Sequence, residues 1–225
     1  MSKRILLFDI DGTLLLNGPV VHQTFLGTIA ELCGATPEAM DFPFAGMTDR
    51  AIFARILEVM GHADDPSKFA EFRRLYPLRL RTIYPQATSP YLLPGVANLM
   101  AALAARDDVA LGVATGNLRE AAYVKLGRFE LDRVFPTGGF GDEHIERWRV
   151  VQEGMEATAH HHGARLDPEN TWVIGDTDKD VEAAHRVGAR VLGVRSGPQA
   201  AQLAGADLVL ENLSDTQSVV ATLTG

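Results

Sequence analysis

A short apolar run near the start of the chain ends in two aspartates and a glycine, and it constrains the fold more than any other segment. The run Ile5–Phe8 is followed directly by Asp9-Ile10-Asp11-Gly12-Thr13. A run of this length that ends at a glycine turn is typical of a strand buried in a parallel sheet. Open α/β sheets bind ligands at the carboxyl ends of such strands, so we expect Asp9 and Asp11 to lie in a functional site.

The two carboxylates are one residue apart, and their mutual repulsion has to be offset by a cation or a shared proton. Mg²⁺ suits the position, because it takes oxygen ligands and is usually held by one or two carboxylates together with a substrate phosphate. A simple Asp-Gly turn with a solvated neighbour is the alternative interpretation of this motif taken alone.

A second acidic cluster lies far along the chain and favours the metal site. The apolar, β-rich segment Thr171–Ile174 ends in Gly175-Asp176-Thr177-Asp178-Lys179-Asp180, and a helical pattern follows over Val181–Val187. Each acidic turn ends a strand of the buried type. Together they predict one metal site that is assembled from both ends of the sequence.

A third strand is expected between the two clusters, at Val109–Ala114, with Thr115-Gly116-Asn117 and a helix over Leu118–Phe129 after it. A hydroxyl group and free backbone N–H groups at the start of a helix form an anion site, because the unpaired amides and the helix dipole both favour negative charge. Capping of the helix by Thr115 or Asn117 is the alternative, and it is the better interpretation of this motif alone.

The three motifs, in this order, resemble the motif series of the haloacid dehalogenase superfamily in its phosphatase branch, over about residues 5–194. The resemblance implies that Asp9 is a nucleophile that forms an aspartyl-phosphate. It also implies that Asp11 protonates the departing alkoxide and then accepts a proton from the hydrolytic water. Dehalogenating relatives lack an acid at the second position, so Asp11 favours cleavage of a phosphate ester.

The resemblance also implies a cofactor and the remaining site residues. Mg²⁺ is expected to be held by the Asp9 side chain, the Asp11 backbone carbonyl and Asp176, with Asp180 supporting the metal shell. Stabilisation of a helix start is the alternative role for Asp180. The catalytic hydroxyl and the phosphate-binding positions are expected at Thr115, Gly12, Gly116 and Asn117.

The lysine that pairs with the nucleophile in many relatives is absent from its usual place. It often lies in a Lys-Pro turn before a later helix, and residues 139–147 contain no lysine. Lys125 is the nearest replacement, because helix side chains point toward the N-terminus and its long stem can reach back to the site. Arg147 is the main rival, and a solvated helix surface is the alternative place for Lys125.

Helical patterns alone fill the segment from Asn17 to Tyr91, whereas helices and strands alternate from Leu93 onward. Further strands are expected at Val191–Val194 and Leu208–Leu210. The alternation predicts an α/β fold, with a Rossmann-like, mainly parallel sheet, helices on both of its faces and a helical cap inserted after the first strand.

The predicted organisation is a discontinuous core of residues 1–16 and 92–225 and a cap domain of residues 17–91. A cap over the carboxyl ends of the strands can exclude bulk water and select the leaving group. Its loop at residues 44–50 resembles the substrate-facing loop of capped relatives. We expect Thr48 or Arg50 to contact the organic part of the ester, with a helix cap and a surface charge as the alternatives.

Composition limits the partners of the chain. Its 225 residues are 46% hydrophobic, which is enough to bury a substantial core. The 21 basic and 29 acidic residues give a formal net charge of −8, without a long basic run. A chain of this kind is a poor binder of nucleic acids and of anionic membranes, so neither partner is predicted.

A cytoplasmic location is predicted from three features. Cys33 is the single cysteine, so no internal disulfide is expected. Asp9 and Asp11 break the N-terminal apolar run, which argues against a signal peptide, and no segment reaches the length of a transmembrane helix.

His160-His161-His162 is interpreted as a solvated helix end, because adjacent helical residues face different directions and cannot all bind one ion. No oligomeric state follows from the sequence.

Three functions remain. The leading one is Mg²⁺-dependent hydrolysis of a small phosphorylated metabolite by an enzyme that resembles phosphoglycolate phosphatases in cap position and motif order. The second is a sugar phosphomutase resembling β-phosphoglucomutase, for which no clear polar cluster is found between His22 and Gln86. The third is a catalytically idle binding protein, which would not need both Asp9 and Asp11. Hydrolysis is therefore predicted.

Overall fold

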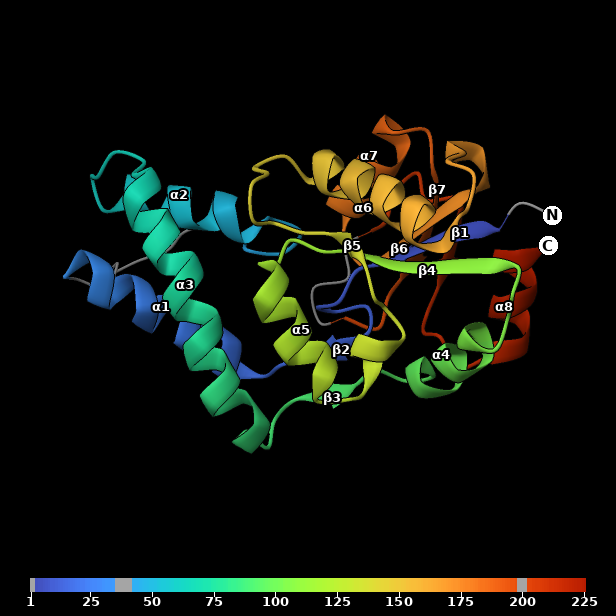
Figure 1. The fold of residues 1–225 in the computed structure, drawn as a ribbon, viewed down its shortest axis with the longest axis horizontal. Helices are drawn as coiled ribbons and strands as arrows, with labels where there is room; N and C mark the ends of the chain where they lie inside the picture. Colours follow the sequence, from blue (N-terminus) through green and yellow to red (C-terminus); the bar gives the residue numbers. More distant parts are fainter. Residues whose placement is uncertain (1–2, 35–41, 198–201) are drawn as a thin grey trace.

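A six-stranded parallel sheet forms the centre of the computed structural model, which describes residues 3–34, 42–197 and 202–225 (Figure 1). The strand order is β5-β4-β1-β6-β7-β8, and every neighbouring pair is parallel. The strands are β1 (Arg4–Phe8), β4 (Val109–Ala114), β5 (Gly138–Gly139), β6 (Thr171–Gly175), β7 (Arg190–Val194) and β8 (Leu208–Leu210).

Side chains of the central strands enter two apolar clusters, one on each face of the sheet. In β1, Leu6 and Phe8 pack into one cluster, whereas Ile5 and Leu7 pack into the other. This follows from the two-residue period of a strand. All residues of β4 are buried as well. Strands covered on both faces give continuous apolar runs in the sequence, which is why these strands could be recognised.

Helices cover both faces of the sheet. On one face lie α4 (Val96–Ala104), α5 (Arg119–Gly127) and α8 (Thr216–Thr224), and on the other lie α6 (Arg147–His162) and α7 (Asp178–Arg186) (Figure 1). Short 3₁₀ helices occur at Tyr84–Gln86, Leu131–Arg133 and Pro168–Asn170. The predicted α/β fold, with its Rossmann-like, mainly parallel sheet and helices on both faces, is confirmed.

Three further helices, here called the cap helices, project to one side of the sheet: α1 (Pro19–Cys33), α2 (Asp49–Val59) and α3 (Pro66–Ile83) (Figure 1). They share an apolar cluster of their own, in which the rings of Phe25 and Phe72 meet edge to face at 4.7 Å. The cluster also includes Leu118 and Ala121, so it continues onto α5. The boundaries of a cap at residues 17–91 stay a prediction.

Three short strands were not anticipated. The pair β2 (Leu15–Leu16) and β3 (Tyr91–Leu92) is antiparallel and joins the two chain segments that lead into and out of the cap helices. β5 consists of two glycines that pair with the end of β4. Two residues carry no recognisable periodicity, and glycine adds no side-chain pattern, so neither the β2–β3 sheet nor β5 could be read from the sequence.

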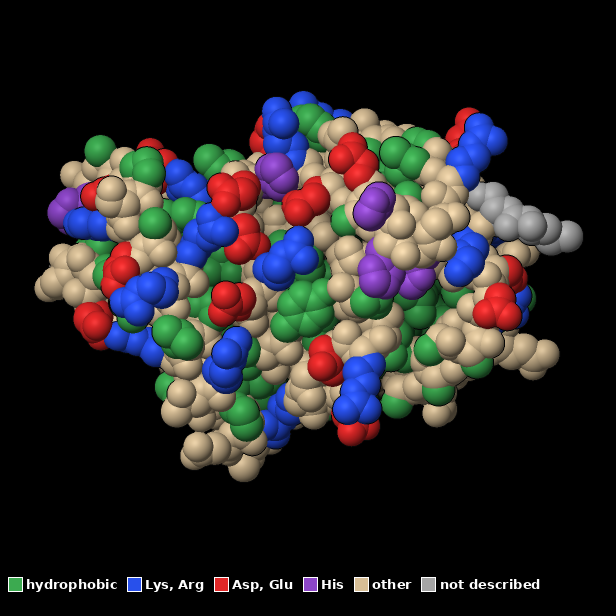
Figure 2. Space-filling model, viewed as in Figure 1, with side chains coloured by type: hydrophobic (Ala, Val, Ile, Leu, Met, Phe, Trp, Pro, Cys, Tyr) green, Lys and Arg blue, Asp and Glu red, His purple; other side chains and the backbone are tan. Residues whose placement is uncertain are grey.

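Charged side chains of both signs are interspersed over the face of the molecule in Figure 2, including the part formed by the cap helices. Among the helices of the described ranges, none combines the length and apolarity that a membrane crossing requires.

Candidate functional site

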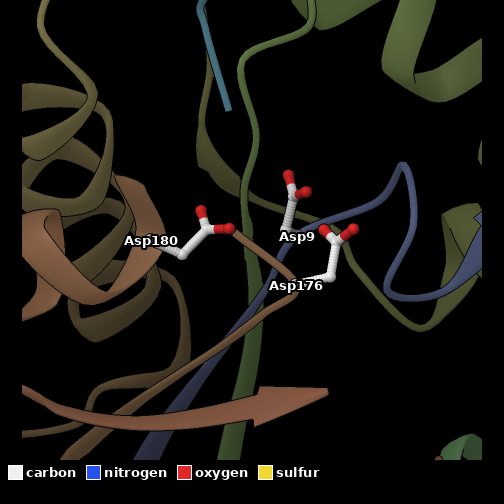
Figure 3. Close-up of side chains that lie close together, drawn as sticks. All are labelled: Asp9, Asp176 and Asp180. Atoms are coloured by element: carbon white, nitrogen blue, oxygen red, sulfur yellow. The ribbon is translucent and has the colours of Figure 1, made fainter. Parts of the chain in front are cut away.

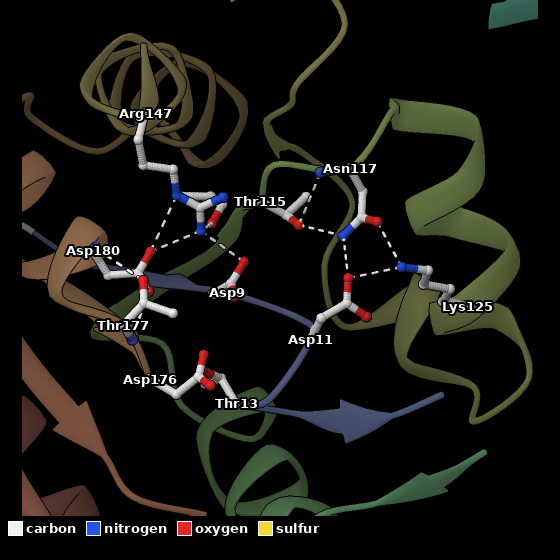
Figure 4. A network of polar contacts seen from close by, with 11 residues as sticks. Asp9, Asp11, Thr13, Thr115, Asn117, Lys125, Arg147, Asp176, Thr177 and Asp180 are labelled. Atoms are coloured by element: carbon white, nitrogen blue, oxygen red, sulfur yellow. Dashed lines mark hydrogen bonds and ion pairs between the residues drawn. The ribbon is translucent and has the colours of Figure 1, made fainter. Parts of the chain in front are cut away.

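The three sequence motifs meet at one edge of the sheet because they follow three neighbouring strands. Asp9 directly follows β1, Thr115 directly follows β4 and Asp176 directly follows β6, and the sheet order places β1 between β4 and β6 (Figure 4). Gly12 makes the close approach possible. Its φ is +91°, and a Cβ there would lie 2.1 Å from Oδ2 of Asp176. A larger residue at this position would displace that carboxylate.

Three buried carboxylates form an acidic cluster. Asp9, Asp176 and Asp180 each offer an oxygen within 4.8 Å of the others (Figure 3). Burial, followed by repulsion from Asp9 and Asp180, raises the pKa of Asp176 to about 8. Burial likewise raises the pKa of Asp9 to about 6, although the positive charge of Arg147 acts to lower it. For Asp9 and Asp176, burial and repulsion between carboxylates therefore outweigh the effect of the positive charge of Arg147.

Asp176 is the member of the cluster with the fewest partners. Its Oδ1 accepts a long hydrogen bond of 3.4 Å from Thr13 Oγ1, and no described basic side chain forms an ion pair with it. A buried carboxylate without a counter-ion is costly. Oxygen donors on Asp9 and Asp176 are therefore suited to a hard divalent cation such as Mg²⁺.

Asp180 is already occupied by protein donors on both oxygens. Oδ2 accepts hydrogen bonds from the backbone N (3.1 Å) and Oγ1 (2.7 Å) of Thr177, which completes a capping box at the start of α7. Oδ1 accepts from Nε (3.1 Å) and Nη2 (2.8 Å) of Arg147. Direct metal binding by Asp180 would break one of these hydrogen bonds. In this structure Asp180 positions Arg147 and takes part in capping α7.

Arg147 is the cation that contacts Asp9. Its Nη2 lies 2.7 Å from Oδ1 of Asp9 and 3.0 Å from the carbonyl oxygen of Ala114, and its side chain is buried (Figure 4). Burial alone would lower the pKa of Arg147, but the carboxylates of Asp180 and Asp9 raise it, so the guanidinium stays charged. The expectation that Lys125 pairs with Asp9 is therefore wrong, because the rival residue at the start of α6 occupies that place.

Lys125 instead contacts Asp11. Its buried ammonium lies 2.7 Å from Oδ2 of Asp11 and 2.6 Å from Oδ1 of Asn117 (Figure 4). Nδ2 of Asn117 and Nδ2 of Asn17 also donate to the Asp11 carboxylate. Burial alone would raise the pKa of Asp11, but the charge of Lys125 and these hydrogen bonds lower it. The carboxylate of Asp11 is consequently ionised in this arrangement.

Thr115 and Asn117 lie at the site rather than on the helix end. Nδ2 of Asn117 donates to Oγ1 of Thr115 at 2.7 Å, and no side chain of its own segment caps α5. The first amides of that helix are bound by acidic residues from elsewhere. The backbone N of Leu118 donates to Oδ2 of Asp49 and that of Arg119 to Oδ2 of Asp142, both at 2.8 Å.

The two cap residues expected at the substrate point elsewhere. Thr48 is fully buried and caps α2, since its Oγ1 accepts from the backbone N of Ala51 at 3.1 Å. Arg50 pairs with Asp64 at 3.0 Å, and its guanidinium stacks over the ring of Phe69. These contacts match the helix cap and the surface charge that were considered as alternatives. Neither residue lines the cavity above the site.

Sequence reasoning missed Asp49 and Asn17, which both line this cavity of about 650 Å³. An acidic residue in the first turn of a helix is usually exposed and favourable there, so Asp49 gave no separate signal. Asn17 contacts Asp11 only because the chain turns sharply between them. His162 takes no part in the site, and its Nε2 lies 3.0 Å from the carbonyl oxygen of Leu111.

Comparisons with known proteins agree with the fold. The family model of haloacid dehalogenase-like hydrolases matches residues 3–188. A phosphoglycolate phosphatase of Cereibacter sphaeroides is 26% identical over 191 residues, which cover 81% of each chain.

Solved structures of several bacterial proteins share the fold. A predicted phosphatase from Clostridium acetobutylicum superposes with a TM-score of 0.72 at 18% identity, over 98% of this chain and 100% of the other. CbbY from Rhodobacter sphaeroides, solved in complex with phosphate, has a TM-score of 0.69 at 22% identity, over 96% of both chains.

Proposed function

The chain belongs to the haloacid dehalogenase-like hydrolase family, and from this we propose that it is a Mg²⁺-dependent phosphatase that cleaves a small phosphate monoester through an aspartyl-phosphate on Asp9. One observation carries the proposal. The Asp9 carboxylate lies at a cavity floor, with a cation on one oxygen and a second carboxyl group two residues away. Phosphoglycolate phosphatases among its relatives support the same class of enzyme.

Arg147 prepares Asp9 for attack. Its hydrogen bond fixes Oδ1, which leaves Oδ2 as the oxygen that can form a bond to phosphorus. As that bond forms, the bond from phosphorus to the ester oxygen breaks, and the alcohol leaves. The guanidinium also offsets the approach of an anionic nucleophile to an anionic substrate. Thr115 and Asn117 line the same floor and supply donors for phosphate oxygens.

Asp11 serves both half-reactions. The dianionic substrate raises the pKa of Asp11 through like-charge repulsion, so that its carboxyl group can carry the proton that the departing alkoxide takes. In the second half, the ionised carboxylate accepts a proton from the water that attacks phosphorus and releases Asp9. The pair with Lys125 favours the ionised form and hence this second step.

The donor set fits Mg²⁺. The Asp9 side chain, the Asp176 side chain and the Asp11 backbone carbonyl would hold it, since Asp176 has no cationic partner among the described side chains. Bound there, Mg²⁺ supplies neutralisation of the negative charge on the phosphoryl group.

The helices α1–α3 act, in this proposal, as the cap of residues 17–91 over the site. The start of α2 already contacts the core: the backbone N of Asp49 donates to the carbonyl of Gly116 at 2.6 Å, and that of Arg50 to the carbonyl of Gly141 at 3.3 Å. A small phosphorylated metabolite is the proposed partner, and the cytoplasmic location stays a prediction.

The test is phosphate release from a panel of phosphate monoesters, with Mg²⁺ and with EDTA. Asp9→Asn is expected to lower turnover at least about 10⁴-fold, because the nucleophile is lost. Asp107→Asn, which alters an exposed carboxylate, is the matched control. Acid-quenched wild-type enzyme should carry a phosphate adduct that Asp9→Asn lacks. Equal release by Asp9→Asn and wild type would refute the mechanism, and isomerisation of sugar phosphates without release would indicate a mutase.

A further inference from the structure

The cavity above the site has a polar floor and an apolar upper wall. The upper wall, here called the cap-side wall, is formed by Val21, Phe25, Phe44, Met47, Ile52 and Tyr76. These side chains belong to the apolar cluster of the cap helices. A leaving group attached to a phosphate on the floor would extend toward this wall, because the carboxyl ends of the strands close the other side.

The Lys and Arg side chains that line the cavity already form ion pairs with carboxylates of the floor. Among its described lining residues, Lys125 and Arg147 are the Lys and Arg side chains, and they pair with Asp11 and Asp9. The undescribed residues 1–2, 35–41 and 198–201 contain neither Lys nor Arg. The floor therefore has cations for a phosphate, but the cap-side wall has none.

Arginines of the cap helices lie outside the cavity. Arg50 pairs with Asp64, Arg74 with Glu71 and Arg79 with Glu31. Lys179 is exposed, and its stem lies against Gly46 without lining the cavity. His22 is the one residue of basic type on the described upper lining, and its ring packs against that of Phe44 at 5.3 Å.

An anionic leaving group would be disfavoured at this wall. A carboxylate or second phosphate would lose its hydration against apolar side chains without a counter-ion. The buried side chain of Asp49 also lines the cavity and supplies no positive charge there. Glycolate carries a carboxylate of this kind, so the cap-side wall does not match the substrate in the name of the relatives.

We infer that the substrate is a phosphate monoester whose leaving group is uncharged and largely apolar. The inference rests on the proposed function and specifies the substrate class of the same site. It follows from the position of the apolar cap-side wall opposite a floor whose two cations, Lys125 and Arg147, are paired with Asp11 and Asp9.

The first experiment measures kcat/KM of the wild-type enzyme with Mg²⁺ on matched esters. The uncharged compounds are benzyl phosphate and 4-(hydroxymethyl)benzyl phosphate, and the anionic ones are 4-carboxybenzyl phosphate and phosphoglycolate. We expect the uncharged esters to be preferred about 10²-fold, as for a site that leaves a charge unpaired. Equal or better hydrolysis of the anionic esters would overturn the inference and leave the phosphatase intact. Failure of every ester would overturn both.

The second experiment adds a charge to the wall. Met47→Lys is expected to raise kcat/KM for 4-carboxybenzyl phosphate about tenfold relative to benzyl phosphate, whereas Met47→Gln, of similar length and neutral, should not. An equal change in both variants would show that shape rather than charge controls selection, which would count against the inference.

Discussion

The floor and the cap-side wall of the cavity treat charge in opposite ways. On the floor, Asp9 pairs with Arg147 and Asp11 with Lys125, so each of these two carboxylates has a buried cation as its partner. On the cap-side wall, aromatic and aliphatic side chains face the same cavity, and Asp49 has a backbone amide rather than a cation as its hydrogen-bond partner.

The catalytic residues and the side chains that we propose to select the substrate therefore lie in different parts of the cavity. The floor is built at the ends of β1, β4 and β6, whose positions are fixed by the register of the sheet. The wall is carried by helices inserted between strands, and these can change without disturbing the sheet. A fold of this kind can keep one reaction and vary its substrates through the wall.

Removing the cation that contacts Asp9 on the floor should have the largest effect on activity. Arg147→Ala is expected to lower kcat about 10²–10³-fold, because Asp9 and Asp180 lose a shared buried cation. Arg147→Lys should recover only part of this, since one ammonium cannot reproduce the bidentate contact. Steady-state kinetics provide the measurement, and Arg149→Ala, an exposed arginine on the same helix, is the control. Wild-type turnover in Arg147→Ala would remove Arg147 from the mechanism.

The second prediction concerns the titration of Asp49, which lies between the floor and the cap-side wall. Burial raises its pKa to about 7, so the folded protein keeps a proton that the unfolded chain loses above about pH 4. The contribution of Asp49 to the free energy of unfolding should therefore fall as the pH rises from about 4 to about 7 and stay level above. Between pH 5 and 8 this amounts to about 3 kcal/mol.

Urea denaturation in EDTA at pH 5 and 8 measures this effect. Asp49→Asn has no carboxyl group to titrate, and its oxygen can still accept from Leu118, so its stability should fall by about 3 kcal/mol less than that of the wild type over this interval. Asp107→Asn should behave like the wild type. Identical pH dependence in Asp49→Asn would mean that Asp49 is charged in the folded protein at pH 5.

Metal binding should give the smallest of these effects. Mg²⁺ at about 100 times its Kd should add about 2.7 kcal/mol to the free energy of unfolding, which raises the melting temperature by about 5–10 °C. Because the pKa of Asp176 is raised to about 8, protons compete with the metal, and the increase should be larger at pH 8.5 than at pH 6.

Asp176→Asn should lose most of this thermal shift, whereas Asp178→Asn, which alters the neighbouring exposed carboxylate, should retain it. A shift of the same size in Asp176→Asn and wild type would exclude Asp176 as a ligand, and the contrast between a metal-dependent floor and an uncharged wall would lose its basis.

The sequence by itself determined five of the six strands of the sheet and the meeting of the motifs. Buried parallel strands appear in the sequence as continuous apolar runs, so β1, β4 and β6 could be located from those runs alone. Parallel topology then brings their carboxyl ends to one edge, which places Asp9, Thr115 and Asp176 together without knowledge of any side-chain contact.

Only the tertiary structure decided which cation contacts which carboxylate. Arg147 reaches Asp9 because α6 begins beside the end of β4, and Lys125 is thereby left to Asp11. Arg50 turns outward and Asp49 turns inward, although they are neighbours in the chain. The reason is physical: a strand's place follows from local patterns, whereas the partner of a long charged side chain depends on where distant helices begin and on which buried charges remain unpaired.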